Sequence, residues 1–243
     1  MRKIFCAVLA LMLFFLSALA EDEIPTAAEL FEQNSSPDVP LSGDPYIDPL
    51  LRLTNKQNGL PWDYVPELRD VNVLHKKGIA TQQMVPEAAD ALEEMFAAAE
   101  QDGITLAAVS GYRSYSAQKL IYNRKVEERG SAAALTSAPP GHSEHQLGLA
   151  MDISCKSISY RLNAAFADTE EGQWLASHCA EYGFIIRYKK EWMDITGYKR
   201  EPWHVRYIGR EHARLVQELN VPYETYLEYL ELCWTNKNLD IPE

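Results

Sequence analysis

The sequence predicts a single α+β domain in which helices flank a largely antiparallel sheet. Short apolar runs of strand length are interrupted by segments of helical periodicity at unequal spacing, unlike the regular alternation of βαβ units. The pattern contains no internal repeat and no second shift in composition after residue 46. With 47% hydrophobic and 24% charged residues among 243, the chain has an ordinary globular composition. This composition excludes collagen-like and wholly disordered proteins.

The N-terminus has the order of a secretory signal peptide. Arg2 and Lys3 precede an apolar run, which is followed by small residues and then by an acidic segment. Because the run is short for a bilayer span of about 20 residues, we expect cleavage after Ala20 rather than retention as an anchor. Cys6 lies inside the apolar run rather than at its end, which disfavours a lipoprotein. The sequence therefore predicts a secreted or extracytoplasmic protein with no stable membrane insertion after cleavage.

The composition divides the mature chain into three parts. Residues 21–45 are rich in Pro, Ser, Asp and Glu and lack periodicity, so we expect a flexible linker. The globular pattern begins at Tyr46, and we place one domain at residues 46–235. A short C-terminal tail at 236–243 completes the chain.

Helices and strands of the domain are predicted from apolar periodicity and from residues that begin or end helices. Pro86 opens an amphipathic segment that Asp102 and Gly103 stop, and Gly130 ends a second one in which Leu120 is expected to face inward. In chain order, we expect a helix at 86–101, a strand at 104–109, a helix at 116–128, a strand at 147–153, a helix at 170–182, a strand at 183–188, and helices at about 209–219 and 222–232.

Charge and cysteine content limit the classes of partner and of fold. The net charge is −12, and it becomes −14 once the signal peptide and its two basic residues are removed. A charge of this sign argues against nucleic acid or anionic lipid as an electrostatic partner. Cys155, Cys179 and Cys233 remain in the mature chain, an odd number, so the protein is not a disulfide scaffold. One disulfide bridge and buried free thiols are both compatible with this pattern.

The first motif with chemical character runs from Ser143 to Asp152. On a straight strand Asp152 takes the face opposite Met151, and His145 falls on the core side. His145 and Asp152 can therefore converge only if the chain bends between them, and Gly148 is where we expect the bend. An acidic residue that ends an apolar strand needs a partner, because an unpaired buried carboxylate is costly. A metal ion would supply one.

The second motif is Glu201-Pro-Trp-His204. Glu and His three residues apart resemble half of a helical metalloprotease motif, but Pro202 biases Glu201 away from a helix and indicates an extended or turn segment. On an extended chain the two side chains point to opposite faces unless the chain bends. Taken alone, each motif also fits a structural role, the second as a surface turn around a buried Trp203.

Together, the two motifs supply the ligands of a catalytic metal centre. His145, Asp152 and His204 form a set of two nitrogen donors and one oxygen donor, which suits a zinc ion with a coordination position open to water. Glu201 would then be a carboxylate outside the ligand set, able to accept a proton from that water. His142, three residues before His145, is an alternative ligand without a motif of its own.

A third element is the turn between the predicted strand and helix that surround Ser110. Arg113 at this strand end is suited to hold a carboxylate through a bidentate pair, and Gln118 could add an amide contact. The alternative is an ordinary turn in which Arg113 pairs with a structural acid.

These three segments resemble the VanY-type D-alanyl-D-alanine carboxypeptidases. The likeness is carried, in this order, by Ser-Gly-Tyr-Arg-Ser at 110–114, by Ser-Glu-His-Gln-Leu-Gly-Leu-Ala-Met-Asp at 143–152, and by Glu-Pro-Trp-His at 201–204. It extends from about Leu53 to Gly209. The family belongs to zinc peptidases that share a fold with Hedgehog and the lysostaphin-like enzymes, so the resemblance implies that fold for this domain.

The resemblance also implies roles for individual residues. It places one zinc ion on His145, Asp152 and His204, with Glu201 as the catalytic base. The substrate-binding residues that it implies are Arg113, as anchor of the terminal carboxylate, with Gln118 and Ser143.

The implied function is zinc-dependent removal of the C-terminal D-alanine from a peptidoglycan stem peptide. The ligands and the base do not separate this activity from that of an L,D-carboxypeptidase, a D,D-dipeptidase or an endopeptidase. An alternative of another class is a non-catalytic, zinc-stabilised wall-binding module. The presence of Glu201 beside a complete ligand set argues against that alternative.

Overall fold

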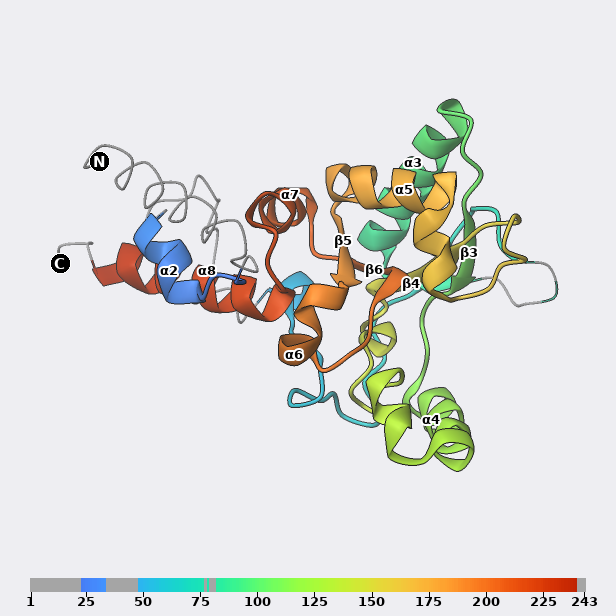
Figure 1. The fold of residues 1–243 in the computed structure, drawn as a ribbon, viewed down its shortest axis with the longest axis horizontal. Helices are drawn as coiled ribbons and strands as arrows, with labels where there is room; N and C mark the ends of the chain where they lie inside the picture. The colour runs from blue at the N-terminus through green and yellow to red at the C-terminus, as the bar shows by residue number, and fades with distance from the viewer. Residues whose placement is uncertain (1–22, 34–47, 77, 79–81, 240–243) are drawn as a thin grey trace, which may run out of the picture.

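A four-stranded antiparallel sheet forms the centre of the molecule (Figure 1). The computed structural model describes residues 23–33, 48–76, 78 and 82–239. The strand order is β3-β4-β6-β5, and a separate antiparallel pair joins β1 to β2. The predicted α+β class with an antiparallel sheet is therefore confirmed. The strands are β1 (Arg69–Asp70), β2 (Gln83–Met84), β3 (Ala107–Ser110), β4 (Ala150–Ser154), β5 (Phe184–Tyr188) and β6 (Glu201–Tyr207).

The five predicted helices occur in the predicted order, with short 3-10 segments between them, and α2 and α6 are α-helices that were not predicted. The predicted helix at 170–182 is in fact an α-helix, α5, followed by a 3-10 turn, η6. The α-helices are α2 (Ala27–Gln33), α3 (Pro86–Gln101), α4 (Tyr115–Arg129), α5 (Glu170–His178), α6 (Met193–Thr196), α7 (Arg210–Leu219) and α8 (Tyr223–Leu239). The 3-10 segments are η2 (Pro49–Leu51), η3 (Gly130–Leu135), η4 (Glu144–Leu147), η5 (Ala164–Asp168), η6 (Cys179–Tyr182) and η7 (Lys190–Trp192).

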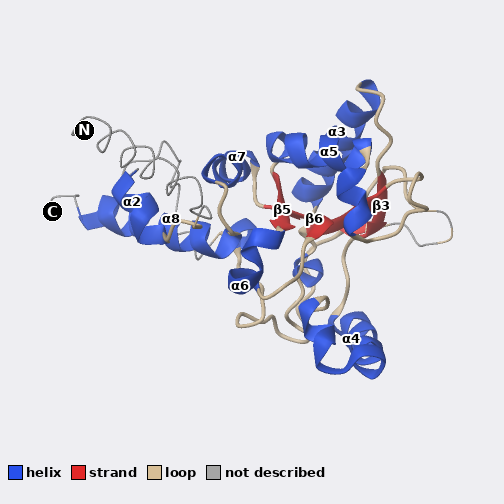
Figure 2. Cartoon of the chain, viewed as in Figure 1, coloured by secondary structure: helices blue, strands red, loops and turns tan. Residues whose placement is uncertain are grey.

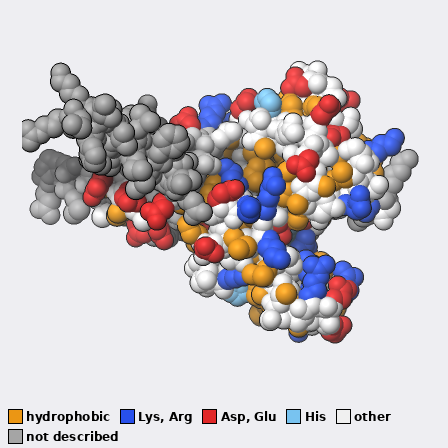
Figure 3. All heavy atoms as spheres, viewed as in Figure 1, with side chains coloured by type: hydrophobic (Ala, Val, Ile, Leu, Met, Phe, Trp, Pro, Cys, Tyr) orange, Lys and Arg blue, Asp and Glu red, His pale blue; other side chains and the backbone are white. Residues whose placement is uncertain are grey.

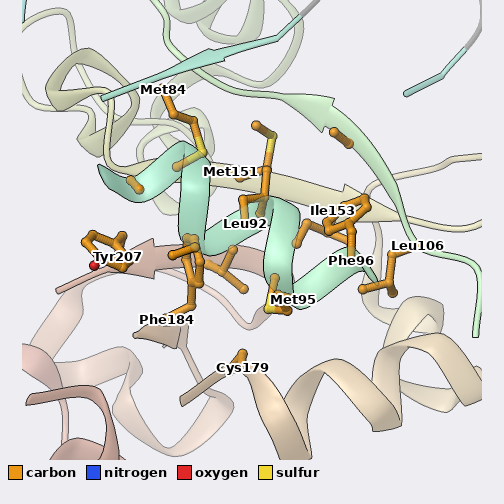
Figure 4. Close-up of a cluster of buried hydrophobic side chains, with 14 of the residues drawn as sticks. Met84, Leu92, Met95, Phe96, Leu106, Met151, Ile153, Cys179, Phe184 and Tyr207 are labelled. Atoms are coloured by element: carbon orange, nitrogen blue, oxygen red, sulfur yellow. The ribbon is translucent and has the colours of Figure 1, made fainter. Parts of the chain in front are cut away.

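The main hydrophobic core lies between helix α3 and the sheet (Figure 4). Leu92 and Met95 of α3 are fully buried against Met151 and Ile153 of β4 and Phe184 of β5. Full burial of each such side chain contributes about 2 kcal/mol through the hydrophobic effect. Because β4 carries its apolar residues on this face, its opposite face is left for polar side chains.

A second core joins both ends of the described chain. Ala27 and Leu30 of α2 are buried in a cluster with Tyr226 and Leu230 of α8 (Figure 1). Helix α2 lies inside the segment that we predicted to be a flexible linker, so that prediction is wrong for residues 27–33. The helix is only seven residues long and is stabilised by packing, which a search for sustained periodicity does not detect. The predicted signal peptide and residues 21, 22 and 34–45 of the linker segment lie outside the described residues.

Helix α4 stands apart from α3 and α5 (Figure 2). Gln118 is its buried residue, whereas Leu120 is 74% exposed. The prediction that Leu120 faces inward is therefore wrong. The helix packs chiefly on the neighbouring segment η3 and not on the sheet, so its apolar residues have little core to enter. Its buried face instead lines the functional cleft described below.

Cys155, Cys179 and Cys233 are free thiols, and all three are buried. Within the described ranges, none of the helices has the length and apolar character needed to cross a lipid bilayer.

Gly148 forms the bend expected between His145 and Asp152. Segment η4 ends at Gly148, which has a left-handed backbone with φ +71°, and β4 begins two residues later. A Cβ at this position would lie 2.9 Å from Leu68 Cδ2 and 3.1 Å from Val85 Cγ2. Only glycine satisfies both the backbone angle and the close packing.

Replacement of Gly148 by alanine should destabilise the protein more than the same change at Gly103. Both glycines have positive φ, but no atom lies within 4 Å of a Cβ built at Gly103. The Gly103→Ala change should cost about 1 kcal/mol for the left-handed backbone alone, and Gly148→Ala about 2–4 kcal/mol because steric overlap is added. Urea unfolding of both variants measures the difference. Equal losses would contradict the tight packing described here.

Candidate metal centre and catalytic cleft

The register of the sheet aligns three polar residues in one row across neighbouring strands. Asp152 of β4 pairs with Ser110 of β3 on one side and with His204 of β6 on the other. The register shifts between Ala108 and Ser110, which adds one residue to β3. Directly opposed residues on one face of an antiparallel pair have neighbouring side chains. Ser110, Asp152 and His204 therefore have neighbouring side chains on the polar face of the sheet.

A second irregularity places Glu201 beside His204. Strand β5 pairs Ile186 with Val205 and Tyr188 with Glu201, so two residues along β5 correspond to four along β6. Pro202 lies in this shifted segment, where an interior strand tolerates proline. The shift resolves the conflict of faces noted for the sequence, because a straight strand would separate Glu201 from His204. Both side chains line the same cleft.

His145, Asp152 and His204 converge into one buried group of potential metal ligands. Their ligand atoms lie within 4.8 Å of one another, and all three residues are buried. His145 Nε2 is 3.4 Å and His204 Nδ1 is 3.0 Å from the same atom, Asp152 Oδ1. The two imidazole rings meet edge to face, with 5.0 Å between their centroids. The structure thus brings together the three residues that the sequence predicted as ligands.

The outer nitrogen of His145 is held by the backbone. His145 Nδ1 lies 2.8 Å from the carbonyl oxygen of Gly111. Because a carbonyl oxygen only accepts hydrogen bonds, Nδ1 carries the proton and donates it. This leaves the lone pair of Nε2 directed toward Asp152 and available to a metal ion.

The outer nitrogen of His204 is held by Glu144, a residue that the sequence reasoning missed. His204 Nε2 donates a hydrogen bond of 3.1 Å to Glu144 Oε2. The other carboxylate oxygen, Oε1, accepts from Arg187 Nε at 2.8 Å and from Arg206 Nη1 at 3.2 Å. Burial raises the pKa of Glu144, but the two guanidinium groups outweigh it and hold the pKa well below its usual range. The charged carboxylate directs Nδ1 of His204 toward the metal position.

The charges of the group favour a cation. Burial raises the pKa of Asp152, but His145 and His204 outweigh it and lower this pKa. Burial lowers the pKa of His204, but its hydrogen bonds to Asp152 and Glu144 raise this pKa to about 9. A metal ion that binds His204 Nδ1 would have to displace a proton from this nitrogen. Two imidazole nitrogens and a carboxylate, each with a supporting partner, fit the ligand preferences of zinc.

The pKa of Glu201 lies near neutral pH. Burial raises its pKa to about 7, against the opposing effect of His204. In the described part of the chain, Glu201 belongs to no ion pair and lies outside the group of metal ligands. A carboxyl with such a pKa can both accept and release a proton near pH 7.

Arg113 lies beside the metal ligands, and Gln118 supports it. Arg113 Nη2 is 3.8 Å from Asp152 Oδ2 and donates to Ser110 Oγ at 2.9 Å. Its Nη1 donates to Gln118 Oε1 at 2.7 Å, while Gln118 Nε2 donates to the carbonyl oxygen of Ala138 at 2.6 Å. Both ends of Gln118 are thus engaged by protein groups. Ser143 precedes η4 and lines the cleft.

All seven residues predicted for the site line one cleft of about 640 Å³, a volume typical of ligand pockets. His142 is held elsewhere, because its Nδ1 lies 2.8 Å from the carbonyl oxygen of Asn55. Tyr188 and Tyr198 also line the cleft, and the Tyr198 hydroxyl is buried without a hydrogen-bond partner among the described residues. A buried hydroxyl without a partner is a functional signal that the sequence could not give.

The sequence contains one indication of the buried network of Glu144, Arg187 and Arg206. Arg187 stands within the apolar strand β5 and Arg206 within β6, and both side chains are fully buried. A charged residue in a buried strand requires a buried partner of opposite charge. Glu144, which directly precedes a predicted ligand, was the acidic residue to test.

A buried His-Asp-His group with a carboxylate beside it, in an α+β domain, defines the class of zinc-peptidase-like sites. The family model described as D-alanyl-D-alanine carboxypeptidase, VanY, matches residues 81–210. YodJ of Bacillus subtilis (strain 168) is 46% identical over 183 residues, which cover 74% of this chain and 67% of YodJ. The chain belongs to the VanY family of carboxypeptidases, whose activity is directed at peptidoglycan peptides.

Two solved structures are similar to this chain. The LdcB LD-carboxypeptidase is 46% identical with a TM-score of 0.71, and the match covers 75% of this chain and 88% of LdcB. The D,D-pentapeptidase VanY from a VanB-type resistance cassette, solved with Zn(II), is 33% identical with a TM-score of 0.64. That match covers 74% of this chain and 99% of the VanY chain. The fold is that of the Hedgehog/DD-peptidase group, as the resemblance implied.

The Glu144→Gln variant should bind zinc about 10–100-fold more weakly than the wild type, because the orientation of His204 loses its charged acceptor. Glu224→Gln is the matched control. Glu224 also pairs with Arg187, at 2.6 Å, but no contact joins it to His204. Competition with a chromogenic chelator measures the zinc affinity of both folded variants. Equal affinities for zinc in the two variants would show that Glu144 does not orient the ligand.

The Glu201→Gln variant should stabilise the metal-free protein in a pH-dependent manner. The folded-state pKa of about 7 exceeds the ordinary glutamate value of 4.5, so the folded state retains a proton that the unfolded state loses. The cost of burying the carboxylate is absent below about pH 4.5, grows as the pH rises, and is complete above about pH 7. It amounts to on the order of 3 kcal/mol.

Thermal unfolding in chelator at pH 8 and at pH 4.5 measures this effect. We expect Glu201→Gln to raise the melting temperature at pH 8 and to leave it nearly unchanged at pH 4.5. Glu191→Gln, at an exposed position, is the control. A gain in stability that is equal at both pH values would contradict the burial of a charged Glu201.

Proposed function

We propose that this protein is a zinc-dependent carboxypeptidase that removes the C-terminal D-alanine from peptidoglycan stem peptides. The observation that carries the proposal is the convergence of His145, Asp152 and His204 in a cleft that also holds the buried carboxyl of Glu201. Structural ion pairs alone do not require a carboxyl with a pKa near 7 beside such a group.

His145, Asp152 and His204 are the proposed zinc ligands. His145 would contribute Nε2 and His204 Nδ1, since the other nitrogen of each ring is occupied by Gly111 or by Glu144. When bound, zinc acts as a Lewis acid and lowers the pKa of water in its open position. The protein supplies the orientation of the ligands, the exclusion of solvent and a place for the proton.

Glu201 is the proposed catalytic base. Its carboxylate accepts the proton of the attacking water and passes it to the leaving amine of D-alanine. A general base works best when its pKa lies near the working pH, so that it is available in both forms. The pKa of about 7, raised by burial, supports this role, and the positive charge of a bound zinc ion would counteract part of this increase.

Arg113 is the proposed anchor for the free carboxylate at the end of the substrate. Its guanidinium group is held in place by Ser110 and Gln118, which leaves further N–H groups available. Because the Gln118 amide is engaged at both ends, we propose that it positions Arg113 and does not contact substrate itself. Ser143, which directly precedes η4 and lines the cleft, is proposed to contact the peptide.

The residue that precedes the scissile bond decides between two versions of this activity. The D,D version, expected from the motifs, acts on a pentapeptide stem that ends in D-alanyl-D-alanine. The L,D version acts on a tetrapeptide stem, and the higher identity and TM-score of the LdcB LD-carboxypeptidase favour this version for the present chain. Either substrate lies outside the cytoplasm, which supports the prediction of an extracytoplasmic location.

Defined stem peptides test the proposal. Wild-type protein loaded with zinc should release single D-alanine residues, and we expect the tetrapeptide to be hydrolysed faster than the pentapeptide. Mass spectrometry of the products identifies the residue that leaves. Activity should vanish with a chelator, return with zinc, and be lost in Glu201→Ala protein that still binds zinc.

Stoichiometric zinc without cleavage of any stem would reject the proposal in favour of a wall-binding module. Release of a dipeptide, or cleavage inside a cross-linked stem, would instead indicate a dipeptidase or an endopeptidase.

A further inference from the structure

We propose that the cleft contains a second anion site, built on Lys125 and Arg129 of helix α4, that binds a further carboxylate of the stem peptide. This carboxylate is distinct from the C-terminal one assigned to Arg113. The inference deepens the proposed function, since it takes a wall peptide as the ligand, but it rests on other residues and other observations.

Lys125 is a partly buried cation that lines the cleft. Its Nζ donates to the carbonyl oxygen of Thr136 at 2.8 Å. Within the described ranges, Lys125 takes part in no ion pair with a carboxylate. Burial lowers its pKa; the nearby charge of Glu201 opposes this effect, whereas those of Arg113 and Arg129 add to it. An anion entering the cleft would relieve both the desolvation of Lys125 and this repulsion.

The geometry of α4 aligns Lys125 with the residue that supports Arg113. Gln118, Ile121, Lys125 and Arg129 line the cleft and stand at positions i, i+3, i+7 and i+11 of one helix face. With a rise of 1.5 Å per residue, Lys125 lies about 10 Å along the helix from Gln118. An extended peptide covers this distance in about three residues. This helix face therefore places Lys125 and Arg129 farther along the cleft than Gln118, the residue that supports Arg113.

The charge of the cleft differs from that of the protein. Basic residues that line it are Arg113, Lys125, Arg129, Lys199 and Arg200, whereas the acidic ones are Glu144, Asp152 and Glu201. Glu144 is already neutralised by buried arginines. Figure 3 shows basic side chains gathered over α4 and along the notch beside it, on a chain with a net charge of −12. Such a local excess of positive charge attracts an anionic ligand.

The stem peptide offers carboxylates of the required kind. A γ-linked glutamate retains its free α-carboxylate, and diaminopimelate at the third position has a carboxylate at the end of its side chain. Lysine at the third position has the same ammonium group without that carboxylate. Both carboxylates lie within a few residues of the terminal D-alanine, which matches the distance along α4 between Gln118 and Lys125. The shared chemistry is a second carboxylate, and matched peptides separate its two sources.

Binding of three tetrapeptide stems to zinc-loaded Glu201→Gln protein tests the inference without turnover. The first stem contains γ-glutamate and diaminopimelate, the second has the glutamate α-carboxylate amidated, and the third has lysine in place of diaminopimelate. Calorimetry gives the Kd of each. We expect the first stem to bind about tenfold more tightly than at least one of the others, the size of a charge-assisted hydrogen bond.

Lys125→Met in the same background should abolish this preference while leaving the weaker stem's Kd nearly unchanged. Lys119→Met is the matched control, because Lys119 lies on α4 but does not line the cleft, and it should retain the preference. Arg129→Gln, at an exposed position, should reduce the preference and serves if Lys125→Met fails to fold.

Equal binding of all three stems, an absence of binding, or an equal loss for all stems in Lys125→Met would overturn the second anion site. Hydrolysis of the first stem by wild-type protein is measured separately. A retained binding preference without hydrolysis would reject the L,D version of the proposed activity and leave the anion site standing.

Discussion

The rest of the site depends on the hydrogen bonds that the buried carboxylate of Glu144 accepts. It accepts hydrogen bonds from His204, Arg187 and Arg206, and so links η4 to strands β5 and β6. Arg187 continues the network to Glu224 of α8 through two further bonds. Buried charges of this kind are costly unless every one is paired, and removal of one partner typically costs about 3–5 kcal/mol. The network thus fixes His204, a proposed metal ligand, relative to the C-terminal helix, although its contribution to stability alone could be replaced by apolar packing.

The network explains why the two histidines present different nitrogens to the same position. The carbonyl oxygen of Gly111 accepts a hydrogen bond from His145 Nδ1, and Glu144 accepts one from His204 Nε2. These partners lie on the polar side of the sheet, where the row of Ser110, Asp152 and His204 crosses three strands. The opposite side of β4 packs against α3 and is apolar. A single strand therefore separates the core from the chemistry, and the alternation of its side chains makes this possible.

Much of this arrangement could be predicted from the sequence, and the failures have identifiable physical causes. The parity of β4 located the bend at Gly148, and the three motifs identified residues that the structure brings into one cleft. The sequence did not reveal Glu144, because pairing with Arg187 and Arg206 depends on contacts across 43 and 62 positions of the chain. Helix α4 was expected to bury Leu120, but it lies beside the cleft and not on the core. Helix α2 is too short to show periodicity and depends on α8 for its burial.

The central claim is that Glu144 and Gly111 select the ligand atoms of a zinc site formed by His145, Asp152 and His204. Diffraction from crystals of zinc-loaded protein, recorded on both sides of the zinc absorption edge, tests it most directly. The account predicts one strong anomalous peak bonded to His145 Nε2, His204 Nδ1 and the Asp152 carboxylate, with Glu144 still bonded to His204 Nε2. A peak bonded to His204 Nε2, or a peak outside this group of residues, would contradict it.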